Sequence, residues 1–268
     1  MKPKYVKWIA EEKGIVLEDG YPITCYRLDY SLEDDVYDEW ALHLRQHYES
    51  DDELRESIIE TGLSAEEYLR TYVIPQKTDS FGNAARSSDF TEILISDLIQ
   101  FIHGFNVPRC KQSNRSGKTN SAHGTDILAY KYKHNDKKPC NEDELLAIEV
   151  KGGLSSDKFD PIVKAVEDSV KYDEARHAFT LNYYRKKLKK LNKQEESEEI
   201  ARFQKKSKIN YTINYIAAAV VSCKNISNGV IMDIKSEQLE LRANNRIFLL
   251  HGDTLMDLVH SIYERCIK

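Results

Sequence analysis

The chain has 268 residues, of which 41% are hydrophobic and 31% are charged, and this is the ordinary composition of a folded globular protein. Its longest apolar run falls far short of the roughly 20 residues that span a bilayer. The N-terminal segment MKPKYVKWIAEEKG lacks the apolar core of a signal peptide. We therefore expect a cytoplasmic protein with no membrane partner.

The five cysteines are widely scattered, odd in number and never arranged as a CxxC pair. This spacing argues against a disulfide framework and against a zinc knuckle. We expect reduced and mostly buried thiols.

The formal net charge of −5 hides an uneven distribution of charge along the chain. Residues 1–74 contain 8 Lys and Arg against 18 Asp and Glu, a balance of −10, whereas residues 75–268 contain 31 against 26, a balance of +5. An acidic surface repels phosphate, so it would face away from DNA, contact a basic partner, or shield an active site until something moves it. A surface that only keeps the chain soluble is an equally good interpretation.

The first third of the chain predicts a short strand at residues 21–30, followed by helices at 34–48 and after the capping box that begins at Ser64. We predict that residues 1–75 form an acidic, mainly helical N-terminal lobe. The polar segment 76–88 is the predicted boundary, and residues 76–268 form the second domain.

That second domain begins with the helical spacing of apolar residues over 89–103, which places Glu92 in the first turn of a helix. Strands are then predicted, followed by helices from residue 161, a charge-dense insertion at about 180–208, further strands and a closing helix. The predicted strands cover residues 107–112, 125–132, 145–151, 214–223 and 246–250, and the closing helix covers 254–266. These elements predict an α/β fold with a mixed central sheet flanked by helices.

Two short motifs carry the candidate chemistry: Gly124-Thr125-Asp126 at the start of one strand and Glu149-Val150-Lys151 at the end of the next. Side chains alternate along a strand, so Glu149 and Lys151 share one face while Val150 packs on the other. Two carboxylates and the Val150 backbone carbonyl would suit Mg²⁺, and Lys151 would orient a water or the phosphate. The alternative is an ion pair at an exposed strand end.

Glu92 is a candidate fourth member of this group, because a helix that precedes the strands can turn its first residues towards the strand ends. The alternative for Glu92 is a favourable interaction with the helix dipole. His123 is more simply interpreted as a local hydrogen-bonding residue than as a catalytic group.

Two basic segments are candidates for contact with DNA. The polar loop that carries Lys111, Arg115 and Lys118 leads directly into the strand that bears Asp126. The segment 185–190, with Tyr183 and Tyr184 beside it, could bind a phosphate backbone and stack on bases. Its alternative is a solvated helical hairpin in which the acids of residues 195–199 pair with the basic residues.

Together, the helix with Glu92 and the two motif-bearing strands resemble the PD-(D/E)xK nuclease superfamily, the fold of many restriction endonucleases, over about residues 89–221. Thr125 stands where that superfamily often has proline. Over its whole length the chain is similar to the HamA family, the nuclease subunits of Hachiman antiphage defence systems, which work with a helicase subunit, HamB.

This resemblance implies a restriction-endonuclease-like core and DNA cleavage that the helicase partner holds in check. It implies that Asp126 and Glu149 bind Mg²⁺, with Mn²⁺ as a second candidate, and that Lys151 is the catalytic lysine. The alternative from a different class is an inactive DNA-binding or assembly subunit with the same fold. No P-loop is present, so the chain itself is not expected to hydrolyse ATP.

Overall fold

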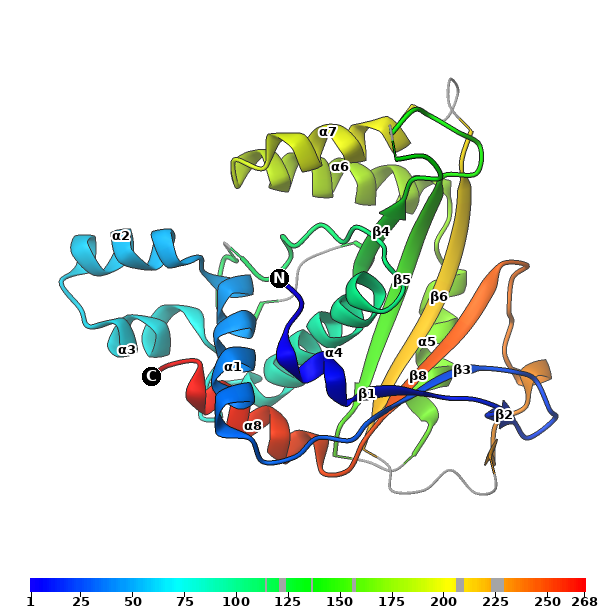
Figure 1. Ribbon diagram of the computed structural model, residues 1–268, viewed down its shortest axis with the longest axis horizontal. Helices are drawn as coiled ribbons and strands as arrows, with labels where there is room; N and C mark the ends of the chain where they lie inside the picture. The colour runs from blue at the N-terminus through cyan, green and yellow to red at the C-terminus, as the bar shows by residue number, and fades with distance from the viewer. Residues whose placement is uncertain (114, 121–123, 136, 156–157, 206–209, 223–228) are drawn as a thin grey trace.

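A six-stranded mixed sheet forms the centre of the molecule (Figure 1). The computed structural model describes residues 1–113, 115–120, 124–135, 137–155, 158–205, 210–222 and 229–268. In spatial order the strands are β1 (Ile9–Glu12), β3 (Thr24–Leu28), β8 (Asn245–His251), β6 (Thr212–Val221), β5 (Glu144–Gly153) and β4 (Ile127–Lys131). The four central strands are parallel, and the two edge strands are antiparallel to their neighbours. The predicted mixed sheet is confirmed and is consistent with a restriction-endonuclease-like core.

One face of the sheet is covered by the 3-10 helix η1 (Lys4–Trp8) and by the helices α1 (Asp34–Tyr48), α4 (Gly82–Phe101) and α8 (Leu255–Arg265), as Figure 1 shows. These helices and alternate residues of the strands share the largest hydrophobic cluster. On β5, Leu146, Ile148 and Val150 point into this cluster. The alternation therefore turns Glu149 and Lys151 towards the opposite face.

The opposite face is covered by α5 (Asp160–Val170) and by the antiparallel hairpin of α6 (Glu174–Lys190) and α7 (Gln194–Phe203). Helix α5 packs Ile162 and Ala165 against Ala217 and Ala219 of β6. Small side chains on both elements allow the helix to approach the sheet closely. The helices predicted from residue 161 onward are thus confirmed. In the hairpin of α6 and α7, Glu195 and Glu199 pair with Lys137, and the insertion at about 180–208 stays a prediction.

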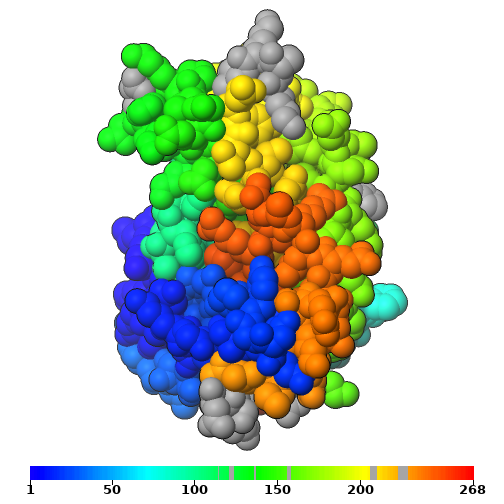
Figure 2. All heavy atoms as spheres, turned by 90° about the vertical axis from the view of Figure 1, so that its right-hand side faces the viewer, coloured from blue at the N-terminus to red at the C-terminus, as the bar shows by residue number. Residues whose placement is uncertain are grey.

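The acidic N-terminal third contributes to the central sheet as well as to separate helices. Strands β1 and β3 pair beside β8, and β2 (Val16–Leu17) pairs with β7 (Val230–Ile231). Figure 2 shows these N-terminal strands, in blue, lying against the segment around β7 and β8, in orange. Helices α2 (Asp51–Thr61) and α3 (Ala65–Tyr68) and the π-helix η2 (Leu69–Val73) project from the body (Figure 1). The boundary after residue 75 stays a prediction, although the sheet and its main core draw on both sides of it.

Two predicted elements are wrong in detail. Residues 107–112 form no strand, because Pro108 lacks a backbone donor and the basic side chains here bind α4 instead. Helix α4 begins at Gly82, so the predicted boundary segment is helical in its second half. The residues Gly82, Ser87 and Ser88 are poor helix formers. The buried Arg86 donates to the Pro75 carbonyl at 2.6 Å and holds this added helical segment, and the local sequence does not reveal that contact.

No helix of the described residues is long and apolar enough to cross a membrane. Within the same residues Cys110, Cys140 and Cys266 form no disulfide. Cys223 lies outside the described residues.

Candidate active site

Asp126, directly before β4, lies opposite Glu149 in the middle of β5. The antiparallel pairing of β4 with β5 sets Ile127 against Ile148. Asp126 precedes Ile127 and Glu149 follows Ile148, so the two carboxylates meet across this register. The hairpin predicted from the sequence therefore brings the two motifs together.

The backbone of the neighbouring strand fixes the carboxylate of Asp126. The Val150 amide donates a hydrogen bond of 2.8 Å to Asp126 Oδ2. The hydroxyl of Tyr184, from α6, donates to the Asp126 carbonyl at 3.2 Å. These bonds leave Asp126 Oδ1 available for a cation, and the ammonium of Lys111 lies 3.2 Å from it.

Glu92 approaches the same cation from the other face of the sheet. Its Oε2 atom lies 3.4 Å from the ammonium of Lys111. The same atom accepts a hydrogen bond of 3.1 Å from the side-chain amide of Gln112. Because α4 begins at Gly82, Glu92 lies in the helix interior, and its predicted place in the first turn is wrong. The helix dipole therefore does not explain this carboxylate, whose residue is only 6% exposed.

Lys111 occupies the position that a bound cation would take between two carboxylates. The residue is 4% exposed. Burial by itself lowers the pKa of Lys111, but Glu92 and Asp126 outweigh it and raise this pKa above its ordinary value. Lys111 is thus a buried ammonium ion, and its charge neutralises carboxylates that would otherwise repel each other.

Glu149 is also buried and is bound by a cation from α6. The guanidinium of Arg176 donates to Glu149 Oε1 at 2.8 Å. Burial and then the negative charge of Asp126 raise the pKa of Glu149 to about 8, against the lowering effect of Arg176. Burial likewise raises the pKa of Glu92 to about 7, and Asp126 adds to it. Carboxyl groups whose pKa values are raised in this way are common in functional sites.

Lys151 shares its face with Glu149, as alternation predicts, but its ammonium binds a third residue. Asp168 of α5 lies 2.6 Å from Lys151 Nζ. The side chain of Lys151 is 32% exposed, so it has access to solvent. Although burial lowers the pKa of Lys151, the hydrogen bond to Asp168 and the charge of Asp126 raise it.

The residues around Lys111 bind successive carboxylates on α4 and in the segment before it, in antiparallel order. Lys111 binds Glu92, Arg115 binds Asp89 and Lys118 binds Asp79, while the preceding Arg109 binds Asp97; the nitrogen–oxygen distances are 3.4, 2.6, 2.8 and 2.6 Å. We call residues 109–118 the basic strap, within which residue 114 is not described. Contact of Lys111, Arg115 and Lys118 with DNA stays a prediction. In this structure Lys111 and Arg115 pair with α4, and Lys118 pairs with Asp79, which precedes that helix.

Other candidates from the sequence are placed less favourably. Tyr184 lies on the inner face of α6 and is buried in the core, so its ring is not available for stacking on a base. His123 lies outside the described residues.

The carboxylates of Glu92, Asp126 and Glu149 do not all lie within 4.8 Å of one another. Such groups of three ligands occur elsewhere in the described chain, at Glu12, Cys25 and His251 and at His43, His47 and Asp97. In the candidate site, Glu149 and Glu92 stand on opposite faces of the sheet and Asp126 lies between them. Asp126 is therefore the residue that a single metal ion would share with either neighbour.

Sequence reasoning missed Arg176 and Asp168 and misassigned the environment of Lys111. Arg176 lies in the first turn of α6 and Asp168 in α5, where charged residues are ordinary surface choices. Only the packing of these helices against β5 directs them to the site.

The HamA family model matches residues 3–266, nearly the whole chain. No curated protein matches the chain. The fold and the opposed Asp126 and Glu149 agree with the resemblance drawn from the sequence, and the match extends over both the acidic N-terminal third and the basic remainder. The chain belongs to the HamA family, which places it among the components of Hachiman defence.

Proposed function

We propose that the chain is a metal-dependent DNA nuclease of PD-(D/E)xK type, the effector subunit of an antiphage complex that a helicase partner regulates. The observation that carries this proposal is the opposition of Asp126 and Glu149 on neighbouring strands, with Lys151 on the face of Glu149. Family membership supports the defence role. Phosphodiester hydrolysis needs this combination of acidic metal ligands and a nearby cation.

The residues present fit a hard divalent cation. Asp126 together with either Glu149 or Glu92 offers carboxylate oxygens, and the Val150 backbone carbonyl is a further proposed ligand. The ammonium of Lys111 beside Asp126 and Glu92 supports the fit, because these carboxylates already surround one cation. Bound Mg²⁺, or Mn²⁺, would neutralise charge on the phosphate and lower the pKa of a bound water.

The remaining side chains position the reacting groups. The Val150 amide holds Asp126 in one orientation, and Arg176 does the same for Glu149. Lys151 would leave Asp168 to donate to the phosphate or to orient the attacking water. The partly exposed ammonium of Lys151 allows this movement without unfolding of β5.

A second candidate, an inactive subunit with a nuclease-like fold, is favoured by one specific observation. Lys111 and Arg176 already neutralise Asp126 and Glu149, and Lys151 is bound to Asp168. A site whose charges are all paired within the chain is stable without metal. The two candidates differ in turnover, which an assay of cleavage decides.

The test is plasmid degradation by the chain assembled with its helicase subunit, in Mg²⁺ and in EDTA. We expect Mg²⁺-dependent cleavage that falls by about 100-fold or more in Glu149→Ala and in Lys151→Ala. Undiminished cleavage by both variants would remove the site assignment, and no cleavage by the wild-type complex would favour the inactive subunit.

A further inference from the structure

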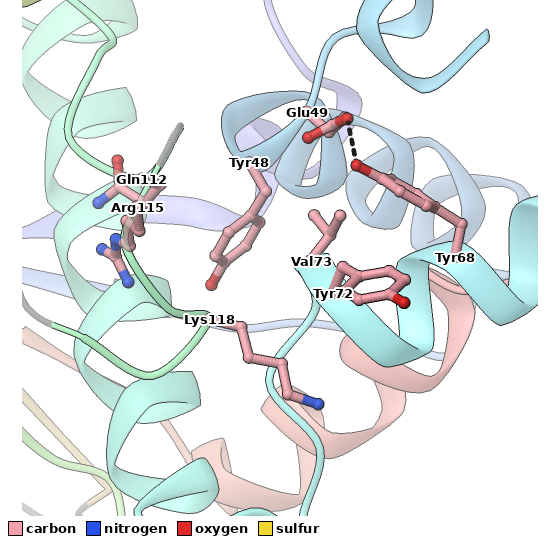
Figure 3. Close-up of a pocket in the computed structure, with 8 residues that line it drawn as sticks. All are labelled: Tyr48, Glu49, Tyr68, Tyr72, Val73, Gln112, Arg115 and Lys118. Carbon is pink, nitrogen blue, oxygen red and sulfur yellow. Dashed lines mark hydrogen bonds between the residues drawn. The ribbon is translucent and has the colours of Figure 1, made fainter. Parts of the chain in front are cut away.

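A polar pocket of about 180 Å³ lies between the N-terminal helices and the basic strap. Figure 3 shows tyrosine rings and Val73 on one side of it and the strap on the other. The lining residues are Tyr48, Glu49, Tyr68, Tyr72, Val73, Gln112, Arg115 and Lys118.

The pocket adjoins the candidate active site through two strap residues. The Gln112 amide donates to Glu92 at 3.1 Å. The guanidinium of Arg115 binds both oxygens of Asp89, at 2.6 and 2.8 Å, and Asp89 lies one turn before Glu92 on α4. A nucleotide in the pocket and a phosphate at the site could therefore belong to one strand.

The positive charges that line the pocket are compensated within the protein. Asp89 neutralises Arg115, and Asp79 lies 2.8 Å from the ammonium of Lys118. The carboxylate of Glu49 accepts bonds from Tyr68, at 3.2 Å, and from Ser57, at 3.1 Å. A phosphate would meet no uncompensated positive charge here, whereas a neutral group with donors and acceptors would meet suitable partners.

The aromatic rings favour a flat group among such neutral ligands. The centroids of Tyr68 and Tyr72 are 5.4 Å apart, and their planes are tilted by 45°. Tyr72 is 59% exposed at the rim, so its ring is accessible to a ligand that enters from solvent. Each of the four nucleobases can stack on such a ring.

We propose that this pocket takes an unpaired nucleobase of the DNA strand whose phosphate lies at the candidate site. This inference rests on the proposed nuclease function and deepens it. A base enters the pocket only when it is free of its complementary strand, so the substrate is single-stranded, melted or terminal DNA. Intact duplex interiors do not fill the pocket.

The test measures binding of a labelled thymidine oligonucleotide and of an abasic oligonucleotide of equal length to the full chain in EDTA, by fluorescence anisotropy. Wild type should bind the thymidine strand about tenfold more tightly than the abasic strand. Tyr72→Ala should lose this difference, whereas Tyr72→Phe, which keeps the ring, should retain it. Phe179→Ala is the matched control, because Phe179 is 56% exposed on α6 and does not line the pocket.

Equal affinity of wild type for both strands would overturn the inference, as would an equal loss on both strands in Tyr72→Ala. If Mg²⁺-dependent plasmid cleavage is intact, either result contradicts base binding in the pocket and does not contradict the proposed function. If the chain binds neither strand and the assembled complex does not cleave DNA, both the pocket and the proposed function fail.

Discussion

The ammonium of Lys111 lies 3.2 Å from Asp126 Oδ1 and 3.4 Å from Glu92 Oε2. Lys111, which the sequence places in a candidate DNA-binding loop, is thus the counter-ion of the carboxylates in the candidate metal site. A divalent cation bound by both carboxylates would have to displace this ammonium, so metal binding and the position of the basic strap are coupled.

Replacement of Lys111 by Met is expected to strengthen metal binding. The substitution removes the competing cation and keeps an apolar stem of similar length. We expect Ca²⁺ or Mn²⁺ to bind about tenfold or more tightly, the scale on which neighbours of metal ligands act. Calorimetric titration measures this change, and Lys118→Met, whose ammonium pairs with Asp79 away from the site, is the control. Unchanged or weaker binding in Lys111→Met would contradict competition by Lys111.

The pair of Arg115 and Asp89 is expected to stabilise the fold. Arg115→Met leaves the Asp89 carboxylate buried, with its side chain 3% exposed. Among the described side chains, the Tyr48 hydroxyl then remains bound to it, at 2.6 Å. Loss of one partner of such a pair costs about 3–5 kcal/mol. Urea denaturation should show this loss, whereas Arg55→Met, which removes an exposed pair with Asp52, should have little effect. Similar stabilities for the two variants would show that the strap is not held by Arg115.

The stability of the metal-free chain is expected to fall as the pH rises. Burial and Asp126 raise the pKa of Glu149 from 4.5 to about 8, so the folded chain binds this proton more tightly than the unfolded chain. The resulting stabilisation is complete below pH 4.5 and is lost as the pH rises through about 8. Glu149→Gln, which is neutral at every pH, should flatten this dependence in urea denaturation with EDTA. An unchanged slope in that variant would contradict the raised pKa.

Helix α2 is expected to dock the helicase partner. It has no buried residue, and Glu56 and Glu60 are exposed along it. Reversing both charges to Lys should weaken assembly by about tenfold at low salt and less at high salt, because surface attraction is screened. The same reversal at the exposed Glu237 and Glu240 is the control. If both double variants bind the helicase subunit with equal affinity in a pull-down, docking through α2 is contradicted.

The sequence predicted the part of the site that local periodicity controls. The alternation along residues 145–151 places Glu149 and Lys151 on one face, and the hairpin turn before it brings Asp126 opposite Glu149. The mixed sheet follows from the same strand and helix patterns. These predictions depend on neighbours in the chain, and therefore need no knowledge of tertiary contacts.

The remaining parts depend on contacts between distant segments. The pairing of Lys111 with Glu92 follows from the antiparallel course of the basic strap along α4, which no periodicity encodes. Arg176 reaches Glu149 because α6 packs over this face of the sheet. The parallel pairing of β3 with β8 joins residues more than two hundred positions apart, and no local pattern indicates that the N-terminal third extends the sheet.

The cleavage rate of Asp126→Asn in Mg²⁺ tests the central claim most directly, because Asp126 lies between both other carboxylates and its substitution keeps its size. The account predicts that the complex with this variant loses plasmid cleavage by about 100-fold or more, while Glu167→Gln on the exposed side of α5 cleaves as wild type does. Undiminished Mg²⁺-dependent cleavage by Asp126→Asn would contradict it.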